Sequence, residues 1–178
     1  MIEQIREVIA ASDMVLLGIG DELSLQKVSK EKLLEAYHTM AQLVAGKPWF
    51  AVTLNTDDVI FESELNRFFI VAPCGSDASG NVVTNVDYDE SEYLPQWQFY
   101  QNWLASTIGK KLCMLEFGVG MKYPSVVRMP FEKMAYLNQK AFLVRVHTKL
   151  AMVPENAMGR SLCISENALD ILEKLKNN

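Results

Sequence analysis

Residues 112–120 read Leu112-Cys113-Met114-Leu115-Glu116-Phe117-Gly118-Val119-Gly120. A short, mostly apolar run that ends in a glycine pair is typical of a buried strand that turns sharply at its carboxyl end. Similar apolar runs occur along the whole chain and predict further strands at 14–18, 49–54, 68–71, 141–146 and 161–164.

Segments with helical periodicity separate these strands. Ser29 is a suitable N-cap, and apolar residues then recur on one face until Gly46 and Pro48 end the helix. Further helices are predicted at 95–106, 130–137 and 167–176. Since strands and helices alternate, we expect an α/β fold with a mostly parallel sheet that is covered by helices on both faces.

The composition argues against several functional classes. With 17 Lys and Arg against 22 Asp and Glu, the chain of 178 residues has a net charge of −5 and no basic run, so nucleic-acid binding is not expected. Three Cys and two His are too few for a disulfide framework or for most metal sites, and no metal site is expected.

Localisation signals are also missing from the sequence. The longest apolar run is far shorter than the ~20 residues that span a membrane, so no membrane contact is expected. The mixed-charge segment at residues 1–7 does not resemble a targeting signal. We therefore expect a cytoplasmic protein with reduced thiols.

Two strand ends carry residues suited to a nucleotide. Gly18 and Gly20 follow the first predicted strand, where glycines let the backbone approach a ligand, although the same pair fits any tight turn. Asn55 and Asp57 follow the second strand, at the edge where ligands bind in doubly wound sheets. These two residues suit ribose hydroxyls or a bound water, and they suit the capping of a turn equally well.

Glu116 lies inside the predicted strand at 112–117. A buried carboxylate is costly unless it is paired, and Arg128 and Arg145 are candidate partners. We interpret Glu116 as one half of a structural ion pair rather than as a catalytic carboxylate.

Several segments in the second half of the chain together carry a family resemblance. They are Leu115-Glu116-Phe117-Gly118-Val119-Gly120, Pro124, Val127-Arg128-Met129-Pro130-Phe131-Glu132 and Leu143-Val144-Arg145-Val146. This pattern resembles the second half of the sirtuins, most of all the microbial branch linked to macrodomains (class M). In the first half, Gly18-Ile19-Gly20 resembles the family's Gly-Ala-Gly loop, and Leu54-Asn55-Thr56-Asp57 resembles its Gln/Thr-Asn-x-Asp element.

The resemblance implies a single Rossmann-like domain over residues 1–178 that binds NAD. Gly18 and Gly20 would line the diphosphate, with Ser24 in the same cofactor-binding loop. Asn55 and Asp57 would face the nicotinamide ribose and are the candidate catalytic residues.

The resemblance also assigns the other end of the cofactor. Gly118 and Gly120 would admit the adenosine side, and His147 would contact the adenine ribose. Sirtuins split the nicotinamide–ribose bond and pass ADP-ribose to an acyl-lysine, or to a protein side chain in the macrodomain-linked branch.

The chain departs from the family pattern at specific places. Cys74 stands where sirtuins carry the catalytic His, and Leu54 replaces a hydrogen-bonding residue. The two Cys-x-x-Cys pairs of the zinc ribbon are absent, and a hairpin or loop at 74–93 is expected in their place. Deacylase activity is therefore not expected.

Two hypotheses for function follow. The first is a reduced sirtuin-like protein that binds NAD or ADP-ribose and cleaves NAD or transfers ADP-ribose to a protein substrate. The second is a non-catalytic binding or assembly module on the same shell. Its trimmed cofactor-covering region would leave apolar surface for a partner or for a second copy in a homo-oligomer.

Overall fold

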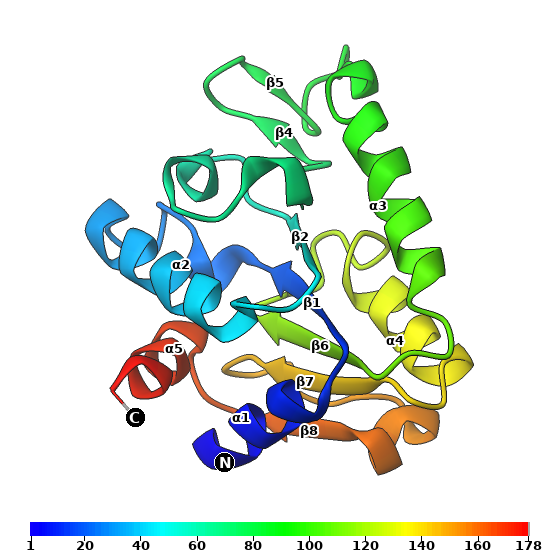
Figure 1. Ribbon diagram of the computed structural model, residues 1–178. Helices are drawn as coiled ribbons and strands as arrows, with labels where there is room; N and C mark the ends of the chain where they lie inside the picture. The colour runs from blue at the N-terminus through cyan, green and yellow to red at the C-terminus, as the bar shows by residue number, and fades with distance from the viewer. Residues whose placement is uncertain (178) are drawn as a thin grey trace.

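The computed structural model describes residues 1–177 (Figure 1). The strands are β1 (Met14–Ile19), β2 (Trp49–Thr53), β3 (Ile70–Val71), β4 (Gly75–Ser76), β5 (Asn81–Val82), β6 (Leu112–Phe117), β7 (Phe142–Val146) and β8 (Ser161–Ile164). The α-helices are α1 (Ile2–Ala11), α2 (Lys30–Val44), α3 (Leu94–Ser106), α4 (Arg128–Leu137) and α5 (Ala168–Lys176).

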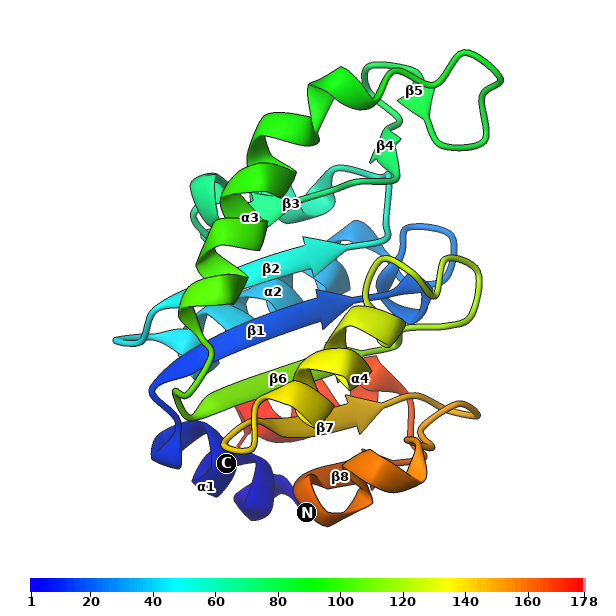
Figure 2. The ribbon, with the colours of Figure 1, turned by 90° about the vertical axis from the view of Figure 1, so that its right-hand side faces the viewer.

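The main sheet has six parallel strands in the order β3-β2-β1-β6-β7-β8. The chain starts in the middle at β1, builds outward through β2 and β3, and then returns to β6 on the other side. This is the order of a doubly wound Rossmann-like sheet, whose ligand crevice lies where the strand order reverses. Figure 2 shows that all the long strands point toward one edge, which also carries the β4–β5 hairpin.

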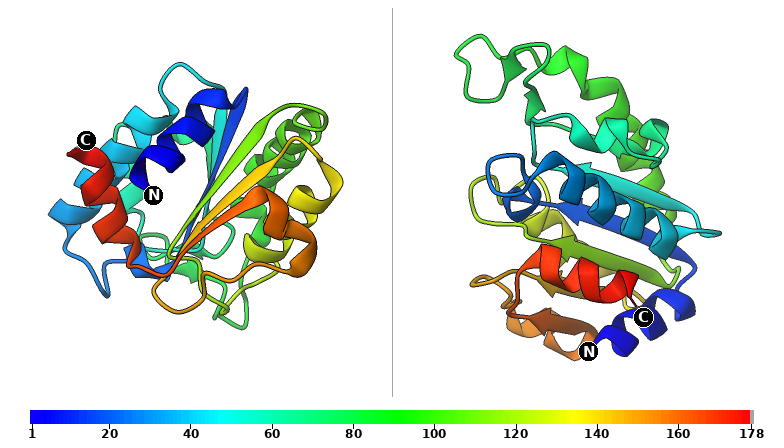
Figure 3. Two further views of the ribbon diagram at one scale, coloured as in Figure 1. Left: turned by 90° about the horizontal axis from the view of Figure 1, so that it is seen from below. Right: turned by 90° about the vertical axis from the view of Figure 1, so that its left-hand side faces the viewer.

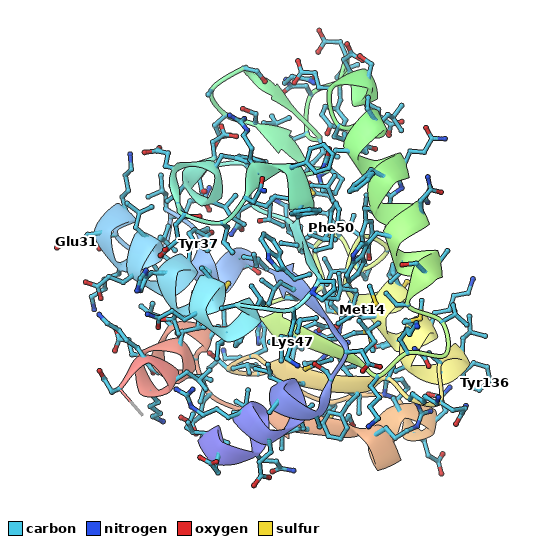
Figure 4. All side chains as sticks on the ribbon, viewed as in Figure 1. Met14, Glu31, Tyr37, Lys47, Phe50 and Tyr136 are labelled. Carbon is cyan, nitrogen blue, oxygen red and sulfur yellow. The ribbon has the colours of Figure 1, made fainter. Side chains whose placement is uncertain are left out.

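Helices cover both faces of this sheet, as the alternation in the sequence predicts. Helices α1, α2 and α5 lie on one face, and α3 and α4 lie on the other (Figure 3). Tyr37 of α2 is fully buried against the first face, and Phe50 of β2 packs against Tyr100 of α3 on the second (Figure 4). The parallel strands are nearly all apolar because both of their faces are buried.

Local sequence signals set several element ends. The Ser29 hydroxyl accepts a hydrogen bond from Lys32 N at 3.4 Å and caps α2, as predicted. Helix α3 begins with Pro95 in its first turn, where a missing N–H costs nothing. Asn167 caps α5 through Leu169 N at 2.9 Å.

The third predicted strand differs from the prediction. Residues 68 and 69 belong to a 3-10 helix (Arg67–Phe69), and only Ile70 and Val71 form β3. Asn66 accepts a hydrogen bond from Phe68 N and so favours the turn. The Phe68 side chain is 55% exposed, so its apolar character does not mark a buried strand.

The Glu116 carboxylate forms a buried ion pair with Arg145 on the neighbouring strand β7. Arg145 Nε donates to Glu116 Oε2 at 2.6 Å, and its Nη2 donates to Oε1 at 2.9 Å. The remaining nitrogen, Nη1, donates to Glu132 of α4 and to Met152 O, both at 2.8 Å. The structural interpretation of Glu116 is confirmed, and the pair joins β6, β7 and α4.

Within residues 1–177, no helix is long and apolar enough to cross a membrane. In the same part of the chain, no three His, Cys, Asp or Glu side chains gather in a way that could hold a metal ion.

Removal of Arg145 leaves Glu116 as an unpaired buried charge. Arg145→Met should therefore lower the free energy of unfolding by about 3–5 kcal/mol. The double variant Glu116→Met/Arg145→Met, which removes both charges, should be more stable than Arg145→Met alone. Urea unfolding of the three proteins measures both effects, and a loss below about 1 kcal/mol for Arg145→Met would contradict the buried pair.

Candidate functional site

A crevice of about 410 Å³ opens at the carboxyl edge of the sheet, above β1, β2 and β6. Pockets that bind small molecules commonly fall between about 300 and 1,000 Å³. The crevice therefore suits a small ligand, and it lies at the switch point of the sheet, where a Rossmann-like fold binds its ligand.

Four segments form the walls of the crevice. The loop after β1 contributes Asp21, Ser24, Leu25 and Gln26, and the loop after β2 contributes Leu54, Asn55, Thr56 and Asp57. The segment that begins just before the β4–β5 hairpin contributes Cys74, Asp77, Val82, Val83 and Thr84. The loop after β6 contributes Gly120, Lys122 and Tyr123.

Asn55 lies in the crevice wall, and its amide holds the loop after β1. Asn55 Nδ2 donates to Gly20 O at 3.1 Å and to Leu23 O at 2.7 Å. The side chain is therefore committed to shaping the wall, and the residue is 8% exposed.

Asp57 joins the same two loops. Its Oδ2 accepts from Leu25 N at 2.9 Å and its Oδ1 accepts from Val59 N at 3.2 Å. Asp57 thus caps the turn before Val59, Asn55 bridges to the loop after β1, and both residues line the crevice.

Asp58 fixes the hairpin above this loop. Its backbone is left-handed, with φ at 61°, and its carboxylate accepts from Ser76 Oγ at 2.7 Å and from Ala78 N at 3.1 Å. The backbone of Asp77 adds a 2.7 Å hydrogen bond to Thr56 O. The hairpin is therefore a fixed wall of the crevice.

The glycines predicted to line a cofactor have different environments. Gly18 is inside β1, and a Cβ there would lie 2.6 Å from Val127 and 2.9 Å from Phe131, so its small size lets α4 pack on the sheet. A Cβ on Gly20 would lie 2.2 Å from Gly118 O, which brings the loops after β1 and β6 into backbone contact. Of the four predicted glycines, only Gly120 lines the crevice.

Gly118 and His147 lie beside the crevice rather than in its wall. Gly118 has φ at 66°, and the side chain of Glu22 fills the space where a Cβ would be. His147 Nδ1 accepts hydrogen bonds from Lys149 N at 3.0 Å and Leu150 N at 3.1 Å, and lies 3.5 Å from Glu22 Oε1. The structure thus places Ser24, Asn55, Asp57 and Gly120 in one wall, and Gly18, Gly20, Gly118 and His147 outside it.

Cys74 lines the crevice, and its thiol is protonated at neutral pH. Burial raises the pKa of the Cys74 thiol to about 11, and the charge of Lys122 offsets only part of this effect. A thiol with this pKa is neither a base nor a strong nucleophile at neutral pH.

Negative charge predominates around the crevice. The carboxylates of Asp21, Asp57 and Asp77 border it, and Lys122 is the single basic side chain among its lining residues within the described chain. Lys27 forms an ion pair with Asp21 from outside the wall. Lys122 also lies over the ring of Tyr123, with its Nζ 5.4 Å from the ring centroid.

Local sequence patterns singled out Gly120 but not the other crevice residues of the loop after β6, nor those of the hairpin. Asp77, Thr84 and Tyr123 belong to segments that hold no recognisable ligand motif. Their position depends on long-range contacts such as Asp58 with Ser76, which local sequence patterns do not reveal. The glycine pair before Tyr123 was the available signal for that loop.

Comparison with known proteins points to one fold. No protein-family model matches the chain. A segment of 90 residues is 24% identical to "Protein ADP-ribosyltransferase" of Staphylococcus aureus (strain Mu50 / ATCC 700699), and it covers 51% of this chain and 29% of that protein. The chain therefore matches less than a third of the length of this curated relative.

Two solved structures align along nearly the whole chain. One comes from work on the structural basis for the mechanism and regulation of Sir2 enzymes, with a TM-score of 0.58, 14% identity and coverage of 98% of this chain and 97% of that one. The other is a Sir2 homolog–NAD complex, with a TM-score of 0.55, 10% identity and coverage of 98% and 92%. The chain has a sirtuin-like fold. The Rossmann-like architecture expected from the sequence is confirmed.

The burial of His147 predicts that the free energy of unfolding decreases at acidic pH. Burial lowers its pKa, reinforced by Arg128 and Lys27 and opposed by Glu22 and Asp21, so the folded protein holds the ring neutral. Because the unfolded pKa is near 6.5, this contribution is fully present above about pH 6.5 and is lost as the pH falls below that value toward the lowered folded pKa.

The variant His147→Asn tests this effect, since its Oδ1 can accept the same backbone hydrogen bonds and does not titrate. When the pH is lowered from about 7.5 to about 5.5, the urea midpoint should fall more for the native protein than for the variant. The two proteins differ only at position 147, so the comparison isolates that residue. An equal fall in the two proteins would contradict the role of His147.

Proposed function

We propose that this protein binds NAD through its nicotinamide–ribose end in the crevice, and that its reaction is NAD cleavage or ADP-ribosyl transfer rather than deacylation. The observation that carries the proposal is the convergence of Asp21, Asn55 and Gly120, from three separate strand ends, on one crevice of a sirtuin-like fold. The relative named as an ADP-ribosyltransferase and the Sir2 homolog solved with NAD support the same ligand class.

The crevice has groups that suit this end of the cofactor. Carboxylates accept hydrogen bonds from ribose hydroxyls, and they attract a positively charged pyridinium ring. Asp77 is best placed for this role, because it borders the crevice and its carboxylate has no hydrogen bond or ion pair within the described residues, whereas Asp57 accepts from two backbone N–H groups and Asp21 pairs with Lys27. Tyr123 adds an aromatic wall.

When bound, NAD would supply the nicotinamide–ribose bond, whose cleavage places positive charge on the ribose. Carboxylates fixed near this position stabilise such charge, as they do in glycoside hydrolysis. Hydrogen bonds from Leu25 N and Val59 N hold the Asp57 carboxylate in place in the crevice wall. Cys74 takes no part, because its thiol stays protonated at neutral pH.

A second function, non-catalytic binding in the same crevice, is favoured by one observation. Leu54 and the protonated Cys74 line the wall where the family resemblance places a hydrogen-bonding residue and a catalytic base. Binding without bond cleavage would then leave the protein as a sensor or an assembly module that responds to the ligand.

Calorimetry and nicotinamide release together test the proposal. Millimolar NAD should bind, and Asp77→Asn should weaken binding about three- to tenfold, because one carboxylate leaves the crevice. Asp87→Asn, which alters an exposed aspartate outside the crevice, is the matched control and should bind like the native protein. Cys74→Ser should change binding and any nicotinamide release by less than about twofold.

The outcomes separate the two functions. Nicotinamide release that Asp77→Asn slows supports the enzyme, and binding without release supports the non-catalytic alternative. If NAD at millimolar concentration produces neither heat nor a thermal shift, the proposal fails.

A further inference from the structure

The carboxylate of Glu22 occupies the edge of the sheet next to the crevice. Glu22 follows β1 in a short 3-10 helix (Asp21–Leu23) and is 6% exposed. Its Oε1 accepts from Thr148 N at 3.0 Å, and its Oε2 accepts from Ala168 N at 3.1 Å. Ala168 is the first residue of α5, and a helix N-terminus is a place where folds of this class bind phosphate. In this protein an internal carboxylate already takes that position.

Backbone contacts leave no space around Glu22. Gly20 N donates to Phe117 O at 3.0 Å, and Glu22 N donates to Gly118 O at 3.3 Å. A Cβ on Gly118 would lie 2.4 Å from the Cβ of Glu22. The loops after β1 and β6 are therefore packed against each other through Gly20 and Gly118, and neither of these two glycines lines the crevice.

The loop after β7 closes the same region from the other side. His147 Nδ1 binds Lys149 N and Leu150 N, which folds residues 147–150 back toward Glu22. Arg128 fixes this arrangement by donating to Val119 O at 2.9 Å and to Leu150 O. The carboxyl end of β7 and the adjoining side of the loop after β6 are thus covered by the protein's own side chains.

A dinucleotide needs both halves of a doubly wound sheet, because each half holds one nucleotide. Here the crevice between the loops after β1, β2 and β6 is open. The region between the loop after β7 and the start of α5 is filled by Glu22. NAD also carries more than twice the non-hydrogen atoms of nicotinamide riboside, together with two negative phosphates that would approach Asp21 at the boundary of the crevice.

We propose that the crevice selects a single, positively charged nucleoside of the nicotinamide riboside class, and that the adenosine diphosphate part of NAD adds no affinity. This inference rests on the proposed function, since it concerns the same crevice. Three carboxylates, Asp21, Asp57 and Asp77, face one lining cation, Lys122, and Lys27 pairs with Asp21 from outside the wall. The remaining excess of negative charge favours a cationic base and ribose hydroxyls over a phosphate. The second nucleotide of NAD would remain outside the crevice.

Calorimetric titration of the full chain with nicotinamide riboside, NAD and ADP-ribose tests this inference. Nicotinamide riboside should bind at least as tightly as NAD, and ADP-ribose should bind at least about tenfold more weakly than nicotinamide riboside. If NAD binds about tenfold or more tightly than the riboside, the inference is overturned while the proposed function stands. If none of the three binds at millimolar concentration, both fail.

The variant Glu22→Ala tests the physical cause. Loss of the carboxylate frees Ala168 N and opens space beside Gly118, so the affinity for NAD relative to the riboside should rise by at least about threefold. Glu155→Ala, at an exposed position away from the crevice, should leave the ratio unchanged. An unchanged ratio in a folded Glu22→Ala protein, checked by circular dichroism, contradicts the role of Glu22. Should that variant fail to fold, the ratio measured on the native chain decides the question.

Discussion

The buried carboxylate of Glu22 joins three parts of the chain that are far apart in sequence. Glu22 lies in the short 3-10 helix that follows β1. Its carboxylate accepts one hydrogen bond from the loop after β7 and another from the first turn of α5. A buried carboxylate needs such partners, and a helix N-terminus is a favourable one because its free N–H groups carry partial positive charge. The arrangement stabilises the fold, and in the proposed ligand selection it also closes the part of the edge beside β7 and α5. The same residue therefore links the stability of the fold to its ligand choice.

The architecture was largely predictable because the signals that set it are local. Apolar runs marked β1, β2, β6, β7 and β8, and Ser29 marked the start of α2. The prediction was wrong at residues 68 and 69, where Asn66 favours a turn and the exposed Phe68 only resembles a strand residue. Periodicity reports burial only indirectly, so an exposed aromatic residue at the sheet edge gives a false strand signal.

The candidate site was predictable in position and less so in detail. The spacing after the strands predicted that Asn55, Asp57 and Gly120 share one edge of the sheet, because the carboxyl ends of parallel strands meet there, and all three line the crevice. It could not show that the Asn55 amide holds Gly20 and Leu23, or that the hairpin supplies a wall. These features depend on tertiary contacts between segments that are 18 or more residues apart, as between Asp58 and Ser76.

The central claim is that Glu22 divides the nucleotide edge of a sirtuin-like fold into an open half and a closed half. A crystal structure of the protein grown with nicotinamide riboside tests it most directly. The claim predicts ligand density between Asp21, Asp77 and Tyr123, with Glu22 still bound to Ala168 N and Thr148 N. Density above β7, with Glu22 displaced from the start of α5, would contradict it.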